Sequence, residues 1–104
     1  VRNERDAASI RGVGMDRLIP IILDVTKTDH IEAAVKTVEA SGLLLVAVVN
    51  NAGITDNLPV EVTPLSKWRK VFDVNLFGAV EVSQHFLPLL RRSAGRIVNV
   101  GSIM

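Results

Sequence analysis

Three polar positions in this sequence of 104 residues stand where side chains could do chemistry at the ends of buried strands. The first is the segment NNAG, in which Asn51, Ala52 and Gly53 follow the apolar run 43–49. Glycine lets a backbone approach a ligand, and ligands of open parallel sheets lie beyond the carboxyl ends of the strands. The segment therefore predicts a binding surface at this edge. The alternative is a strand-end turn whose asparagines satisfy loop backbone groups.

The other two positions are Asn75 and Ser102. Asn75 follows Asn51 by 24 positions, and Ser102 follows Asn75 by 27. Asn75 interrupts the apolar stripe of a predicted helix, and a buried amide without partners costs a few kcal/mol. Its partner could be a backbone carbonyl or an internal water. Ser102 follows the run 96–100, where a serine is either a turn residue or a hydroxyl that faces a ligand.

Hydrophobic patterns predict the elements that must position these residues. Three apolar runs, 18–23, 43–49 and 96–100, have the length and the β-branched content of strands. Their continuous hydrophobicity is typical of parallel strands covered on both faces. Between the first two runs, Thr26 with Asp29 suits a capping box, and Gly42 is placed to end the helix.

The second predicted helix is long. Thr63 is expected to be its N-cap and Pro64 its first residue. Apolar residues, Trp68 among them, then recur at three- and four-residue steps to Arg91, which predicts one buried stripe. Strands that alternate with helices predict an α/β doubly wound fold with a parallel sheet.

Composition excludes several classes of protein. With 48% hydrophobic residues and a formal net charge of +1, the chain should be globular, without the clustered cationic face that nucleic acid or an anionic membrane requires. Cysteine is absent, and His30 and His85 have no second ligand at metal spacing, so we expect no metal site. No apolar run approaches the roughly 18 residues of a membrane span. No signal peptide is recognised, and a cytoplasmic location is expected.

Taken in order, the motifs resemble the short-chain dehydrogenase/reductase family. NNAG after a buried strand, VNLFG in the next helix and RIVNVGS as the following strand occur at about the family's spacing. The resemblance implies a partial Rossmann-type doubly wound parallel sheet with three strands and two main helices. Residues 1–104 would be the central fragment of a single NAD(P)-binding domain. The stretch FLPLLRRSAGRIVNV is similar to segments of retinol and hydroxysteroid dehydrogenases, and 3-ketoacyl reductase-like members contain similar segments.

The resemblance implies a role for each matching residue. Asn51, Ala52 and Gly53 would line the cofactor, and the preceding Asn50 would be structural. The asparagine at 75 would interrupt the hydrogen bonding of its helix and hold a water in a proton relay. The serine at 102 would hydrogen-bond the carbonyl or hydroxyl of the substrate.

Two further positions acquire a role only through the resemblance. Asp24 and Val25, in LDVT, would hold the adenine ring, the acid by a hydrogen bond and its neighbour by packing. Without the family, Asp24 is a loop or capping acid. Arg2 would follow the second strand of a complete domain, where an arginine can pair with a 2′-phosphate and favours NADP over NAD. The alternative is a surface arginine.

Parts of the family's pattern are absent. Gly12 and Gly14 are the only close pair among seven glycines, and they do not complete a phosphate-binding G-x-G-x-x-G motif. There is no tyrosine, which the family uses for proton transfer beside a lysine that lowers the tyrosine's pKa. The chain alone is therefore expected to be inactive. In the family's strand order, 3-2-1-4-5, two strands would separate residues 18–24 from residues 44–50, so these segments should not pair.

The expected function is that of an NAD(P)-dependent oxidoreductase that interconverts an alcohol and a ketone or aldehyde by hydride transfer. Its partner would be a small-molecule alcohol or carbonyl compound, and the intact enzyme would be a homodimer or homotetramer. The alternative is a non-catalytic binding or dimerisation module. Its support is the long helix 64–91, because in relatives the matching helix packs against its twin.

Overall fold

The computed structural model describes residues 1–102, in which two parallel strands form the sheet. Strand β1 (Ala47–Asn50) pairs with β2 (Arg96–Asn99), and Asn50 lies opposite Asn99. Both strands are shorter than the apolar runs that predicted them. The parallel pairing, with helices in the connection between the strands, is the α/β arrangement expected from the sequence.

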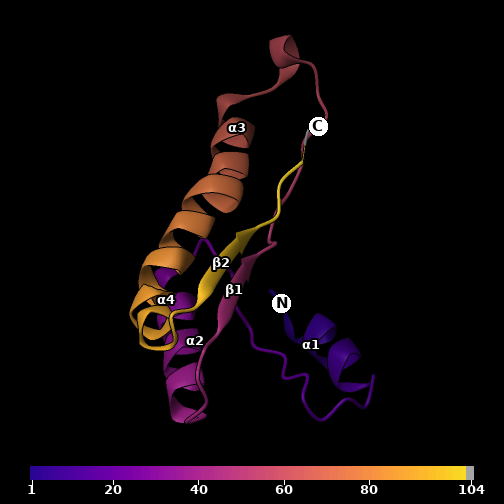
Figure 1. Cartoon of the computed structure of the whole chain (residues 1–104). Helices are drawn as coiled ribbons and strands as arrows, with labels where there is room; N and C mark the ends of the chain where they lie inside the picture. The colour runs from indigo at the N-terminus through magenta and orange to yellow at the C-terminus, as the bar shows by residue number, and fades with distance from the viewer. Residues whose placement is uncertain (103–104) are drawn as a thin grey trace.

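Helices cover one side of the strands. Helices α2 (Thr28–Ala40) and α4 (Ala79–Ser93) pack against each other, and α4 also contacts both strands. Helix α1 (Glu4–Arg11) lies on the other side of the strands in the view of Figure 1. No helix among the described residues is long and apolar enough to cross a membrane.

The long predicted helix is observed as three consecutive segments. Helix α3 (Leu65–Phe72) runs into the π-helical segment η2 (Asp73–Gly78), which runs into α4. The interruption surrounds Asn75, as the resemblance implied. Short π-helical stretches inside α-helices are rare and often mark functional positions. The short helix η1 (Val60–Val62) lies in the loop before α3.

The core lies between α2, α4 and β1. Five buried side chains form it: Ile31, Ala34, Val82, Phe86 and Leu89. They recur at three- and four-residue steps within each helix, which places them on one face.

The predicted stripe is buried in α4 but not in α3. Leu65, Trp68 and Phe72 are 67%, 40% and 49% exposed. The expectation that Trp68 belongs to the core is therefore wrong for the described residues. The reason is that α3 packs against no other element than η2 within residues 1–102.

The first predicted strand does not join the sheet. Its main chain bonds to Val1 instead, because the Val1 amino group donates to the Ile21 carbonyl at 3.1 Å and the Leu23 N–H donates to the Val1 carbonyl at 2.7 Å. The expectation of three strands is thus wrong for the part of the chain that is described. The expectation that residues 18–24 do not pair with residues 44–50 is confirmed.

Coverage of the strands on both faces is also not observed. Val48 packs against the core, whereas its neighbour Val49 is 58% exposed and Val98 is 48% exposed. Side chains alternate between the two faces of a strand, so one face of the pair is open. The open face accords with a chain that is less compact than a typical domain: its radius of gyration is 15.5 Å, whereas a compact chain of this length has a radius of about 13 Å.

Both predicted helix starts are displaced. Helix α2 begins after Lys27, whose side chain has no acceptor and makes no capping bond. The predicted cap, Thr26, precedes the helix by one residue more and donates its N–H and its hydroxyl to Asp24 Oδ1 instead. Helix α3 begins after Pro64. The Thr63 hydroxyl donates to the Pro59 carbonyl at 2.7 Å and does not cap the helix. Gly42 follows α2 with a φ of 70°, which confirms its predicted place at the helix end.

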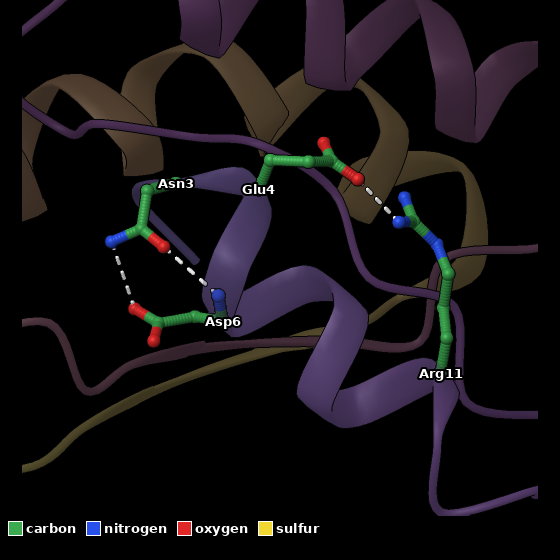
Figure 2. A network of polar contacts seen from close by, with 4 residues as sticks. All are labelled: Asn3, Glu4, Asp6 and Arg11. Atoms are coloured by element: carbon green, nitrogen blue, oxygen red, sulfur yellow. Dashed lines mark hydrogen bonds and ion pairs between the residues drawn. The ribbon is translucent and has the colours of Figure 1, made fainter.

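Helix α1 was not expected from apolar periodicity. Its N-cap is Asn3, whose Oδ1 accepts from the Asp6 N–H at 2.9 Å and whose Nδ2 donates to Asp6 Oδ2 at 3.1 Å (Figure 2). Arg11 in the last turn pairs with Glu4 in the first (Figure 2). An asparagine N-cap followed by acidic residues is a helix signal that does not depend on apolar residues.

Candidate active site

Two clefts open beyond the carboxyl end of β1 and share the segment 51–54 as a wall. The first cleft has a volume of about 770 Å³ and the second a volume of about 600 Å³. Each of the eight predicted site residues borders at least one of them. The first cleft is bordered by Arg2, Asp24, Val25, Asn51, Ala52 and Gly53, and the second by Asn51, Ala52, Gly53, Asn75 and Ser102.

Asp24 closes a tight turn at the wall of the first cleft. Its Oδ1 accepts from the Thr26 N–H at 2.9 Å and from the Thr26 hydroxyl at 2.7 Å. These two bonds are the main cause of a lowered pKa of Asp24; burial opposes them, and the charge of Lys27 adds a smaller lowering. The carboxylate is therefore ionised at neutral pH. Of the two roles suggested by the residues alone, the loop role is observed and the capping role is not, because the N-cap of α2 is Lys27. Asp24 also lies beside the cleft, as the resemblance implied.

Val25, the next residue of this turn, packs against Gly78 at the end of η2. A Cβ built on Gly78 would lie 2.6 Å from Cγ2 of Val25 and 3.0 Å from its Cβ. Carbon atoms in ordinary contact are separated by about 3.5–4.0 Å, so only glycine permits this approach. The wall of the first cleft is thereby in direct contact with the π-helical segment.

Asn75 projects from the π-helical segment toward the wall shared by the two clefts. Its Oδ1 accepts from the Ile54 N–H at 2.9 Å, and its Nδ2 donates to the Ile54 carbonyl at 2.8 Å. A Cβ on Gly53 would lie 3.4 Å from the same Oδ1, so the segment passes directly beside the amide. Of the two expected kinds of partner, the backbone is the one observed. The expectation that this amide is buried is wrong, because the second cleft leaves it exposed.

Ser102 lies beyond the end of β2 and borders the second cleft together with Asn75. Since β1 and β2 are parallel and in register, the residues that follow both strands emerge at the same edge of the sheet. The predicted convergence of the strand-end segment 51–53, the helix amide and the serine is confirmed.

Asn50, expected to be structural, is the last residue of β1. Its Nδ2 donates to the Ser83 hydroxyl at 3.1 Å and to Asn99 Oδ1 at 2.9 Å. One side chain thus connects β1 with α4 and with β2, directly beneath the edge where the clefts open. This placement agrees with a structural role.

A polar face on α3 and the first residue of η2 was not expected from the sequence. Ser66, Arg69, Lys70 and Asp73 all border the first cleft. Their three- and four-residue spacing places them on one side of a helix, and this polar periodicity runs beside the apolar stripe in the sequence. Arg69 and Lys70, with Arg2, bring three cations to the border of the first cleft, against the two carboxylates of Asp24 and Asp73. This excess of positive charge suits a ligand with an anionic part.

Comparison with known proteins agrees with this geometry. The family model described as short chain dehydrogenase matches residues 2–104. The chain is 42% identical over 106 residues to retinol dehydrogenase 16 of Homo sapiens, and the alignment covers 97% of this chain and 33% of that protein. It is 45% identical over 103 residues to estradiol 17-beta-dehydrogenase 2 of Mus musculus, covering 93% of this chain and 26% of that protein. It is 44% identical over 94 residues to the mitochondrial D-beta-hydroxybutyrate dehydrogenase of Rattus norvegicus, covering 86% and 27%.

The chain spans a third or less of the length of these relatives. Among solved structures, serine dehydrogenase from Escherichia coli superposes with a TM-score of 0.87 at 27% identity, covering 97% of this chain and 48% of that one. A short-chain dehydrogenase from Streptomyces avermitilis superposes with a TM-score of 0.85 at 28% identity, covering 98% and 38%. The parallel pair, the interrupted helix and the motif order agree with these matches, and the chain belongs to the short-chain dehydrogenase family.

Proposed function

We propose that residues 1–104 form the central part of a larger NAD(P)-binding Rossmann-fold domain, called here the parent enzyme. The parent enzyme interconverts an alcohol and a ketone or aldehyde by hydride transfer. The observation that carries the proposal is that Asn75 and Ser102, far apart in the sequence, border one cleft together with the segment 51–53. The relatives are named for substrates as different as retinol, estradiol and D-beta-hydroxybutyrate, so the proposal extends to the alcohol or carbonyl class only.

The adenosine end of NAD(P) fits the residues of the first cleft. The turn at Asp24 offers an ionised carboxylate, Val25 offers an apolar side chain, and Gly53 leaves the wall without a side chain. Asp24 would hydrogen-bond the adenine and Val25 would pack against it. Arg2, with Arg69 and Lys70 on the same cleft, supports NADP over NAD through the 2′-phosphate. The cofactor would supply or accept the hydride.

The second cleft would hold the substrate. The hydroxyl of Ser102 would hydrogen-bond the oxygen of the alcohol or carbonyl group and so orient it. Asn75 holds the main chain of Ile54 by two hydrogen bonds. We assign the water of the proton relay to the break in α-helical hydrogen bonding at η2, beside Asn75. These 104 residues include no tyrosine, so the proton-transferring tyrosine of the family would lie elsewhere in the parent enzyme.

Steady-state oxidation of NADPH and NADH by the parent enzyme, with a panel of aldehydes and ketones, tests the proposal. Ser102→Ala should lower kcat by about 10²- to 10³-fold, the usual loss when one hydrogen-bond donor to the reacting oxygen is removed. Ser9→Ala is the matched control, because Ser9 is exposed on α1 and borders neither cleft. Full activity of the Ser102→Ala enzyme would contradict the assignment.

Self-association of the parent enzyme is part of the same proposal. Phe72, Leu76, Phe77 and Val80 are 49%, 46%, 58% and 46% exposed along the helix that begins at α3. Apolar side chains on one helix are suited to an isologous contact, in which the same face of two copies meets. Phe77→Glu should reduce the mass of the parent enzyme measured by light scattering. An unchanged mass would place the contact between subunits elsewhere.

A further inference from the structure

His30 reaches the wall of the first cleft from the first turn of α2. The backbone N–H of Asp24 donates to Nδ1 of His30 at 3.0 Å, and the imidazole is half-buried. An amide nitrogen of this kind always carries its proton, so Nδ1 must be the acceptor. The neutral ring therefore carries its own proton on Nε2.

Several contacts hold the turn, and they act on different parts of it. Asp24 Oδ1 bonds to Thr26 within the turn, and Val25 packs against Gly78 from the side of η2. Two bonds join the main chain of Asp24 to the start of α2: its carbonyl accepts from the N–H of the N-cap residue Lys27 at 2.9 Å, and its N–H donates to the side chain of His30. A half-buried N–H that loses its acceptor must turn toward water or remain unpaired at a cost in free energy. The first response moves the carboxylate that the same residue carries, and the second makes its observed position less stable.

We propose that His30 is a positioning residue for cofactor binding. Its Nδ1 fixes the Asp24 main chain and thereby holds the Asp24 carboxylate in the wall of the first cleft. The inference rests on the proposed function, which assigns the adenine end of NAD(P) to this wall. His30 does not border the cleft, so it acts through Asp24 and does not touch the cofactor.

The test compares two variants of similar shape in the parent enzyme. His30→Leu removes the acceptor, whereas His30→Asn returns one, because Oδ1 of asparagine is bonded to Cγ as Nδ1 of histidine is. Thr28→Val is the matched control, since the Thr28 hydroxyl belongs to the same helical turn but bonds to Glu81 of α4. The dissociation constants of NADPH and NADH are measured by fluorescence at pH 8, where free imidazole is neutral. His30→Leu should weaken binding about threefold to tenfold, as expected for one lost hydrogen bond. His30→Asn and Thr28→Val should stay within about twofold of the wild type.

A spectroscopic signature accompanies the affinities. In the ¹⁵N-labelled parent enzyme, a scalar coupling across the hydrogen bond should connect the Asp24 amide nitrogen with Nδ1 of His30, and His30→Leu should abolish it. Absence of this coupling in the wild type would overturn the inference. Wild-type affinity in His30→Leu would also overturn it. Equal weakening by His30→Leu and His30→Asn would overturn it too, because the ring and not its acceptor would then matter.

Asp24→Ala separates this inference from the function on which it rests. If Asp24→Ala leaves the affinity for both cofactors unchanged, the assignment of the cofactor to the first cleft fails, and the role of His30 fails with it. If Asp24→Ala weakens binding and His30→Leu does not, the cofactor site stands and only the positioning role is wrong.

Discussion

Replacing Gly78 with alanine tests how closely η2 approaches the turn at Asp24. The new Cβ would lie 2.6 Å from Cγ2 of Val25, about 1 Å inside ordinary carbon contact. Overpacking of this kind costs about 1–3 kcal/mol, whereas alanine is favoured over glycine inside a helix by up to about 1 kcal/mol. We therefore expect the free energy of unfolding to fall by about 1 kcal/mol, the difference of these two effects. For a domain of about 150–250 residues, Tm should fall by about 2–4 °C.

Urea denaturation and thermal melting of the parent enzyme measure this loss. Gly101→Ala is the control, because a Cβ on Gly101 would meet no atom within 4 Å. Val25→Ala removes the methyl groups that the new Cβ would strike, so Gly78→Ala should cost about 1 kcal/mol less in that background. The reasoning is refuted if Gly78→Ala destabilises no more than Gly101→Ala. It is also refuted if the effects of the changes at 25 and 78 are additive.

Three substitutions near the clefts, and the isolated chain itself, provide further tests. Asn75→Asp keeps an acceptor for the Ile54 N–H but turns an oxygen toward the Ile54 carbonyl, so kcat of the parent enzyme should fall about tenfold or more; wild-type steady-state rates would contradict this. Thr26→Val should raise the pKa of Asp24, measured by ¹³C titration of its carboxyl carbon, because the hydroxyl bond is the largest cause of the lowered value. Since the folded-state pKa of Asp24 lies below its ordinary value of 3.8, its stabilising contribution is present above that pH and is lost as the pH falls through the folded-state pKa. Urea midpoints of Thr26→Val should therefore decrease less below pH 3.8 than those of the wild type; an equal decrease would argue against the bond. Asn50→Asp removes the donor of two hydrogen bonds and should lower the free energy of unfolding by about 1–3 kcal/mol in urea denaturation, and an unchanged midpoint would show these bonds to be negligible. The 104-residue chain by itself should reduce no carbonyl compound with NADPH, and turnover by a preparation free of contaminating enzyme would falsify this expectation.

The position of the candidate site could be predicted from the sequence because it depends on strand ends. Segment 51–53 and Ser102 each follow an apolar run, and parallel strands end at a common edge. This rule alone predicts that segment 51–53 and Ser102 lie at the same edge of the sheet. The break in the helix at Asn75 could be predicted only from the resemblance to the family. The apolar residues continue on both sides of Asn75, so their periodicity shows no interruption.

Burial could not be predicted from the same patterns. Periodicity shows which side of a helix is apolar, but whether another element covers that side depends on the rest of the structure. This is why Trp68 and Asn75 are exposed where burial was expected. The bond between Asp24 and His30 was out of reach for a different reason. Predicting this bond requires the first residue of α2 to be located without error, and local sequence signals locate a helix end only within one or two residues.

The π-helical segment divides one continuous helix into two parts with different rotational phase. Because the wider turn holds one additional residue, every later side chain lies about 100° around the axis from where an unbroken α-helix of the same residues would place it. An unbroken α-helix formed by the same residues, without the wider turn at Asp73–Gly78, would keep the helical content of the chain. It would nevertheless rotate Asn75 away from Ile54, or else turn Phe86 and Leu89 away from α2. The wider turn thus lets one continuous helix direct side chains toward the cleft at one end and toward the core at the other, although the cleft and the core lie in different directions.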